Sequence, residues 1–156
     1  MEYQHILLNP SQLLAWSINN RNLKEQIEKM MTTYRGHYFS ILNFLFEAKE
    51  NKDKMRFLFV INEDEEEVVG LCRITDEGHN IQYISAVVMN PKYRGKGLCS
   101  KMINFLIRKT KKKGTKYRLE VDIDNEPAIK CYLKSGFRIV KKIRMNTRWN
   151  INLCYQ

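Results

Sequence analysis

The stretch "PKYRGKGLCSK", residues 91–101, separates two apolar segments of the chain. The segment before it, 81–90, is rich in β-branched and aromatic residues, which is typical of a strand. After it, apolar residues recur at helical spacing: Leu98, Met102, Phe105 and Leu106. The stretch is therefore predicted to be a strand-to-helix turn.

Such a turn is suited to binding an anion. The leading N–H groups of a helix have no partner within it, and the helix dipole places about half a positive charge there. Gly95 and Gly97 let the backbone approach a ligand closely, and Arg94 and Lys96 add full charges. A pyrophosphate fits this description. Neither the Walker A pattern nor the Rossmann glycine pattern is present.

The remaining pattern predicts alternating helices and strands in one α/β domain over residues 1–156. Three strands joined by short turns indicate an antiparallel meander. Strands are expected at 5–9, 55–62, 68–75, 81–90, 117–123, 137–143 and 148–155. A first helical segment is expected from Pro10, with Ser11 as N-cap and a break near 19–22, followed by a loop at 32–39. A second helix is expected at 38–50, with Ile41, Leu42, Leu45 and Phe46 on its apolar face. Two more helices are expected at 97–113 and 125–136.

Composition narrows the class of protein. No apolar run reaches the roughly 18 residues that would cross a bilayer, and the N-terminus lacks the features of a signal peptide. We therefore expect no membrane partner and a cytoplasmic location. The four cysteines lie far apart without a CxxC pair, which argues against a metal site and against a disulfide framework.

Positive charge is concentrated in the second part of the chain. Residues 1–91 hold 9 Lys and Arg against 13 Asp and Glu, a net charge of −4, whereas residues 92–156 hold 18 against 4, a net charge of +14. This excess favours a polyanionic partner, either a nucleic acid or a phosphorylated cofactor, over a merely solvated basic surface.

Two motifs together resemble the GCN5-related N-acetyltransferase (GNAT) family. The first is the turn with Arg94, Gly97 and Cys99, where the family has Gly or Ala in place of the cysteine. The second follows about thirty residues later in "NEPAIKCYLKSGF", with Asn125, Ala128, Tyr132, Gly136 and Phe137. The resemblance implies a mixed, twisted sheet of six or seven strands with about four helices, in which strands 81–90 and 117–123 splay apart.

The resemblance also implies acetyl-CoA as the acyl donor, with no metal. Its pantetheine arm would add to the free strand edge at Val87, Val88 and Met89. Its pyrophosphate would lie on the turn, at Arg94, Gly95, Lys96, Gly97, Leu98, Cys99 and Ser100. Asn125 and Tyr132 of the second motif would complete the cofactor-binding site. The small Cys99 should be tolerated, at some cost in affinity.

Amine acetylation requires a general base and a general acid, because an ammonium must lose a proton and a departing thiolate must gain one. By resemblance Tyr132 is the acid, although the same residue would also suit a helix core. For the base, Glu120 is one candidate, and it shares a strand face with Asp122. A water held by Tyr83 or Ser85 is the alternative.

The sequence leaves the acceptor amine open among a protein N-terminus, a lysine, a polyamine and a small molecule. His37, Tyr34 and Tyr38 lie in a loop that would border the acceptor site, or they are simply surface residues. Two other functions compete: a GNAT domain that binds acyl-CoA without turnover, and a basic nucleic-acid-binding module, for which no recognition motif appears. The last strand, 148–155, offers an edge for a homodimer.

Overall fold

The computed structural model describes residues 2–145 and 148–155, and these residues form one mixed sheet of seven strands with five α-helices. The strand order is β1-β2-β3-β4-β5-β7-β6. All neighbouring strands are antiparallel except β4 and β5, which are parallel. The predicted fold class and the meander are confirmed.

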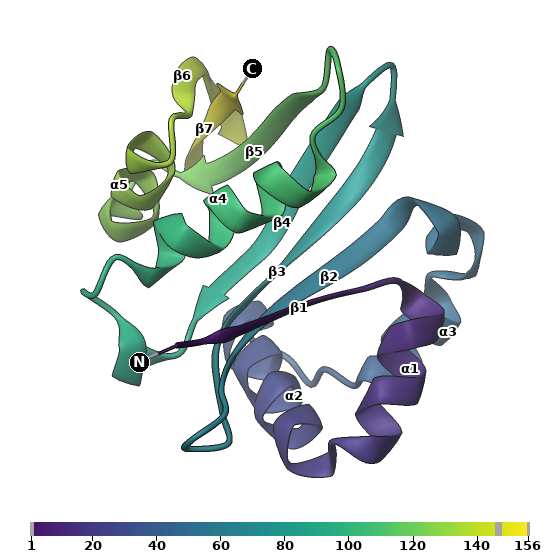
Figure 1. Cartoon of the computed structure of the whole chain (residues 1–156). Coiled ribbons are helices and arrows are strands. Elements are labelled where there is room, and N and C mark those ends of the chain that lie inside the picture. Colours follow the sequence, from purple (N-terminus) through teal and green to yellow (C-terminus); the bar gives the residue numbers. More distant parts are fainter. Residues whose placement is uncertain (1, 146–147, 156) are drawn as a thin grey trace.

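The elements follow the chain in an order that places helices before and after the meander (Figure 1). They are β1 (Gln4–Leu8), α1 (Pro10–Asn19), α2 (Arg21–Arg35), α3 (Ile41–Glu47), the 3₁₀ helix η1 (Lys49–Lys54), β2 (Met55–Asn62), β3 (Glu67–Gly78), β4 (Ile81–Met89), the 3₁₀ helix η2 (Pro91–Tyr93), α4 (Leu98–Thr110), β5 (Lys116–Asp122), α5 (Glu126–Lys134), β6 (Arg138–Met145) and β7 (Arg148–Tyr155).

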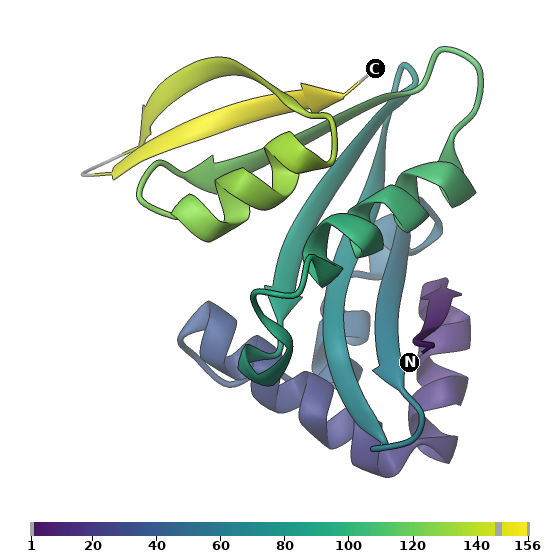
Figure 2. The ribbon, with the colours of Figure 1, turned by 60° about the vertical axis from the view of Figure 1, so that its left-hand side comes forward.

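The helices cover both faces of the sheet. Alternate residues of β2 and β3 point to opposite faces, so Phe57 and Phe59 join one apolar cluster while Leu58 and Val60 join another. The first cluster packs under α1, α2 and α3, and the second packs under α4 and α5 (Figures 1 and 2). The sheet is therefore the middle of three layers, as expected for an α/β protein.

The start and the break of the first helical segment have local causes. Asn9, not the predicted Ser11, is the N-cap: its side chain accepts from the N–H of Gln12 at 2.8 Å, and the Gln12 side chain accepts from the N–H of Asn9 at 2.9 Å. Pro10 then occupies the first helical position, where its missing N–H costs nothing. The predicted break is confirmed at Asn20.

The third helix is shorter and less buried than predicted. It spans only seven residues, so only Ile41 and Leu45, one turn apart, face the core. Leu42 and Phe46, which the periodicity placed on the buried face, are 60% and 68% exposed. The predicted loop also begins later than expected, because α2 continues to Arg35 and ends at Gly36, whose φ of 74° is left-handed.

The C-terminal strand is not an edge. β7 lies between β5 and β6, paired with both, and the edges of the described sheet are β1 and β6. The prediction that residues 148–155 offer a dimerisation edge was therefore wrong, because β7 returns from its hairpin with β6 to pair along β5. None of the described helices has the length and apolar character that a membrane span requires.

Candidate active site

The sheet opens between β4 and β5. These strands are paired only at residues 81–83 with 116–118, and beyond Tyr83 they diverge (Figure 2). The described chain supplies no further strand to this stretch of β4, so Val87, Val88 and Met89 lie on an edge that faces the opening, each partly buried. The predicted splay is thus present.

The edge of β4 is distorted where the strands separate. The pairing of β3 with β4 shifts register between Leu71, opposite Val88, and Arg73, opposite Ser85. The extra residue lies on β4, where Ala86 has a φ of 50°, a left-handed conformation that is uncommon for a residue with a Cβ. Bulges of this kind re-aim backbone groups and side chains and are frequent beside active sites.

The turn before α4 has the geometry that the sequence predicted. Gly95 and Gly97 have φ values of 75° and 72°, and Gly97 is the N-cap of α4 without a side-chain cap hydrogen bond. The Arg94 guanidinium donates to the carbonyl of Met89 at 3.2 Å, which ties the turn to the strand edge. Lys134 of α5 was missed by sequence reasoning, and its Nζ lies 3.3 Å from where a Cβ on Gly97 would stand.

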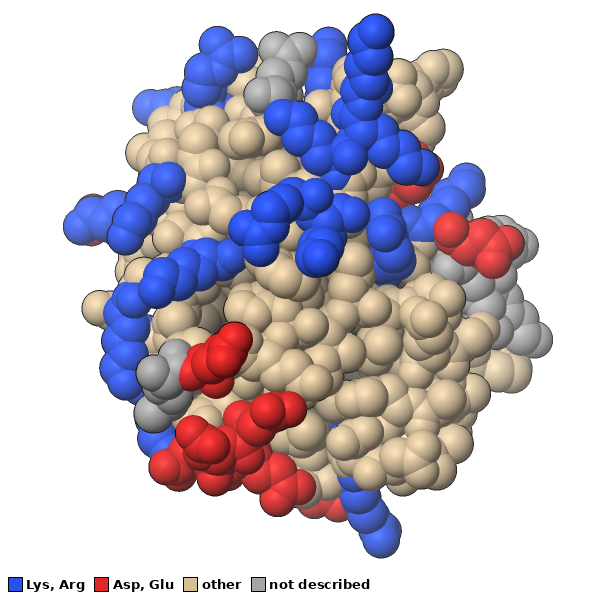
Figure 3. Space-filling view, in the orientation of Figure 1, with Lys and Arg blue, Asp and Glu red and all other residues tan. Residues whose placement is uncertain are grey.

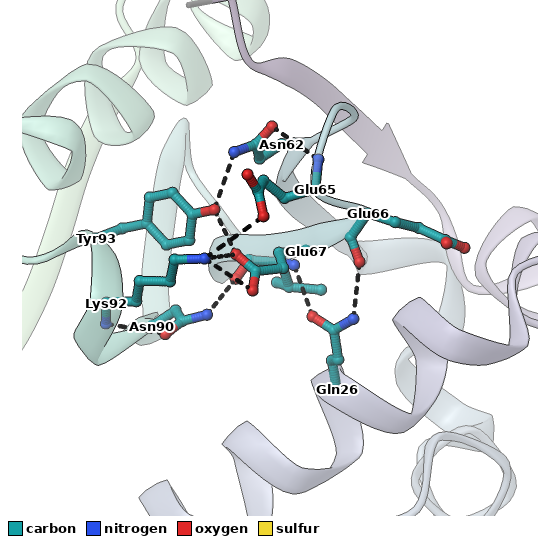
Figure 4. A network of polar contacts seen from close by, with 9 residues as sticks. Gln26, Asn62, Glu65, Glu66, Glu67, Asn90, Lys92 and Tyr93 are labelled. Carbon is teal, nitrogen blue, oxygen red and sulfur yellow. Dashed lines mark hydrogen bonds and ion pairs between the residues drawn. The ribbon is translucent and has the colours of Figure 1, made fainter.

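A polar network holds this turn in place (Figure 4). The Tyr93 hydroxyl donates to Glu67 at 2.5 Å and accepts from the Asn62 amide at 2.9 Å. The Lys92 ammonium donates to Glu67 at 2.9 Å, and Asn90 donates to the carbonyl of Val68 at 2.9 Å. The hydrogen bonds from Tyr93 and then from Lys92 lower the pKa of the Glu67 carboxyl. The acidic segment 63–67, which joins β2 to β3, therefore ends in the anchor of the candidate anion site.

A disulfide links α4 to α5. Cys99 and Cys131 are 32 residues apart in sequence, and their Cα atoms lie 5.9 Å apart. The prediction that the cysteines form no disulfide was wrong: α4 and α5 contact each other on one face of the sheet, which the linear spacing did not show. Cys72 and Cys154 are free, and burial raises the pKa of the Cys72 thiol to about 12.

Tyr132 lies on α5 with only 5% of its surface exposed. Its helix begins at Asn125, whose side chain accepts from the N–H of Ala128 at 3.3 Å. Burial raises the pKa of Tyr132, and the phenols of Tyr34 and Tyr83 and the thiol of Cys72 raise it further. The Tyr132 phenol is therefore protonated over the whole physiological range.

Glu120 lies near the splay but is already engaged. One of its oxygens accepts from Arg118 at 3.2 Å, and Arg118 also forms a bidentate ion pair with Glu77. The Arg118 guanidinium stacks on the ring of Tyr83, 4.1 Å from its centroid. Burial raises the pKa of Tyr83, as does the negative charge of Glu120. Asp122 shares the strand face with Glu120, as predicted.

A cavity of about 340 Å³ adjoins the splay on the α2 and α3 side of the sheet. Tyr83, Ser85 and Ala86 of β4 form one wall, and Arg73 of β3 projects into it. Tyr34 is a lining residue, whereas His37 and Tyr38, predicted with it, are exposed and are not among the described lining residues. The described residues contain no cluster of three or more His, Cys, Asp or Glu side chains that would hold a metal.

The fold corresponds to that of known acetyltransferases. The model of the acetyltransferase (GNAT) family matches residues 23–137. The chain belongs to the acetyltransferase (GNAT) family. A mycothiol acetyltransferase of Corynebacterium glutamicum is 32% identical over 79 residues, which cover 50% of this chain but only 27% of that protein. The similarity thus spans about a quarter of the curated relative.

Solved GNAT structures share the whole fold at low identity. The NatC complex bound to Gag peptide and CoA superposes with a TM-score of 0.72 at 19% identity, covering 99% of this chain and 98% of that chain. Spermidine N-acetyltransferase from Vibrio cholerae, in complex with CoA and spermine, gives 0.68 at 18% identity, covering 98% and 94%. At such identities these likenesses establish the fold alone.

The charge of this GNAT chain is segregated in space as well as in sequence. In the view of Figure 3, Lys and Arg side chains follow α4 and the upper part of the molecule, while Asp and Glu gather near the β2–β3 hairpin. The turn before α4 belongs to the basic region, whereas Glu67, which anchors it, is the first residue of β3 and belongs to the acidic region. The candidate anion site therefore stands at the boundary between the two regions.

Proposed function

We propose that the protein is an acyl-CoA-dependent N-acetyltransferase that transfers an acetyl group from acetyl-CoA to a primary amine by direct attack. One observation carries this proposal: an uncapped, glycine-bounded helix N-terminus opens beside a splayed strand edge, and a buried tyrosine lies on α5, the helix that follows β5.

The donor's groups suit the residues present. The pyrophosphate takes the N–H groups from Arg94 to Ser100, where the helix dipole and the cations of Lys96 and Lys134 favour an anion. The amides of the pantetheine arm pair with the backbone of residues 87–89, as a peptide adds to a sheet edge. Because the sulfur of Cys99 is bonded to Cys131, its side chain is turned toward α5 and not into the turn. Asn125 contributes by holding the start of α5.

The chemistry requires the amine nitrogen to attack the thioester carbon, the C–S bond to break, and one proton to move from nitrogen to sulfur. Tyr132 is the proposed acid, because its phenol is protonated at physiological pH, although the raised pKa makes it a weaker acid than a free tyrosine. The proposed base is Glu120, with Asp122 as a lesser candidate. A water held by Tyr83 or Ser85 is the alternative, and the hydrogen bond from Arg118 to Glu120 favours that relay.

The test is isothermal titration of acetyl-CoA into the purified protein, the Gly97→Glu variant and the Gly114→Glu variant. Both glycines have left-handed φ values, 72° and 80°, so the backbone strain is matched, but only Gly97 lies in the turn. We expect micromolar binding by the wild type and by Gly114→Glu, and none by Gly97→Glu. Circular dichroism of each variant establishes that it is folded.

Turnover is then measured as thiol release with a panel of amines that covers an N-terminal peptide, a lysine peptide, spermidine and small amines. Binding without thiol release from any of them would indicate a non-catalytic acyl-CoA-binding domain. No binding of acetyl-CoA by the folded wild type, together with salt-dependent retention on DNA, would overturn the proposal in favour of a nucleic-acid-binding module.

A further inference from the structure

The cavity beside the splay has an unusual lining. Most of its lining residues are apolar or aromatic, and the described lining contains two arginines but no Asp or Glu. These residues are Leu13, Ile27, Met31, Tyr34, Arg35, Phe39, Ile41, Phe44, Phe57, Phe59, Leu71, Cys72, Arg73, Tyr83, Ser85 and Ala86. With a volume of about 340 Å³, the cavity has the size of a small-molecule site, at the lower end of the usual range.

Arg73 is the more buried of the two arginines that line this cavity. It is half-buried on β3, and burial lowers the pKa of its guanidinium, as does the nearby charge of Arg35. Its Nε donates to the Ser85 hydroxyl at 3.1 Å, and its Cζ lies 5.4 Å from the Phe44 ring centroid. Both partners are neutral, so the positive charge is not compensated by them.

The described carboxylates nearby do not compensate Arg73 either. Glu77 is bound in both oxygens by Arg118, and Asp76 accepts from the N–H of Gly78 at 2.8 Å. Glu47, Asp76 and Glu77 line a more open hollow that adjoins the cavity and shares Arg73 with it, but among the described contacts none of these carboxylates pairs with Arg73. An arginine removed from water without an anionic partner is costly, and its planar fork matches a carboxylate in bidentate fashion.

The cavity also borders the splay. Tyr83, Ser85 and Ala86 line it on β4, where that strand separates from β5, and the Arg73 guanidinium donates to Ser85 at the same place. Tyr34, Cys72 and Tyr83, which line the cavity, also raise the pKa of Tyr132 on α5. A ligand whose carboxylate meets Arg73 therefore lies beside the splay. The apolar part of such a ligand lies among the aromatic side chains of α2, α3 and β2.

We propose that the acceptor is a small primary amine that carries a carboxylate and an apolar or aromatic side group, with the carboxylate on Arg73 and the amine toward Tyr132. This inference rests on the proposed acetyltransferase function and names its substrate class. The cavity itself favours such an acceptor over a polyamine, because its described lining has two arginines and no carboxylate, whereas Glu47, Asp76 and Glu77 line the adjoining, more open hollow.

The test compares L-phenylalanine, phenethylamine and spermidine as acceptors at saturating acetyl-CoA. Phenethylamine keeps the amine and the aromatic group and lacks only the carboxylate. We expect phenylalanine to have the highest kcat/KM. In Arg73→Gln, its KM should rise on the order of 10- to 100-fold, the value of a lost charge-assisted hydrogen bond, while kcat/KM for phenethylamine changes little. Arg56→Gln is the matched control, since Arg56 precedes Phe57 on β2 and therefore points to the other face of the sheet.

A second measurement does not depend on turnover. The reaction product, N-acetyl-L-phenylalanine, is titrated into the wild type, Arg73→Gln and Arg56→Gln, and the thermal midpoint is followed. Stabilisation of the wild type and of Arg56→Gln, but not of Arg73→Gln, supports the inference. Equal use of phenylalanine and phenethylamine, or a preference for spermidine, overturns it and leaves the acetyltransferase function standing. Failure to bind acetyl-CoA at all would instead remove the proposed function.

Discussion

Removing the Cys99–Cys131 bond is expected to destabilise the protein by a predictable amount. The bond closes a loop with a sequence separation of 32 residues. In the chain-entropy description, the bond lowers the conformational entropy of the unfolded chain. Removing it therefore reduces the free energy of unfolding by about 4 kcal/mol. For a chain of this size, that corresponds to a fall of roughly 10 °C in Tm.

The assay is thermal unfolding with and without dithiothreitol, followed by circular dichroism. Reduced wild type and the Cys131→Ala variant should both melt roughly 10 °C below the oxidised wild type. Cys154→Ala should keep the full difference between oxidised and reduced states, because Cys154 is free. Alkylation of the unfolded, unreduced protein should label two cysteines, Cys72 and Cys154, and leave two protected.

Two outcomes would refute this reasoning. Labelling of all four cysteines without reduction would mean that Cys99 and Cys131 are not joined. Two protected cysteines combined with unchanged melting on reduction would mean that the bond exists but does not restrict the unfolded chain in the expected way. The second outcome would point to residual contacts between α4 and α5 in the unfolded state.

Two other perturbations follow from the site. Tyr132→Phe should lower kcat about 100-fold or more with unchanged acetyl-CoA affinity, because the ring keeps its packing and only the proton donor is lost; unchanged kcat would remove Tyr132 as the acid. Glu67→Gln should weaken acetyl-CoA binding through the turn that Tyr93 and Lys92 anchor. Because the pKa of Glu67 is lower in the folded protein, its ionised carboxylate stabilises the fold. This contribution to the free energy of unfolding is fully present above the ordinary carboxyl pKa and is lost as pH falls through the lowered value. Urea unfolding of wild type and Glu67→Gln should therefore differ at pH 7 and converge at acidic pH, and a constant difference would contradict the assignment.

Local signals were enough to predict the parts of the site that lie close together in sequence. The turn at Gly95 and Gly97 needs left-handed backbone, and glycine supplies it whatever the tertiary context. The start of α5 likewise follows from Asn125 as a cap and Pro127 in the first turn. The splay was expected only through the resemblance to the GNAT family.

Features that depend on packing between distant segments were missed. The Cys99–Cys131 bond exists because two helices lie side by side, and the place of β7 depends on its pairing with β5, neither of which has a local sequence signal. The N-cap at Asn9 was available in the sequence, because Gln12 three residues later completes a capping box, and Ser11 was the wrong choice. Arg73 gave no signal at all, since a single arginine in a strand ordinarily faces solvent.

The concentration of positive charge on one side of the molecule has a consequence for its stability. With a net charge of +14 over residues 92–156, the folded second half repels itself, and any multivalent anion in the turn relieves that repulsion. The proposed acyl donor would then also be a counterion of the native state, and its concentration would shift the folding equilibrium. Phosphate, nucleotides and nucleic-acid fragments compete for the same role. Protein purified in their presence will melt higher and bind donor more weakly than protein freed of them by washing in high salt.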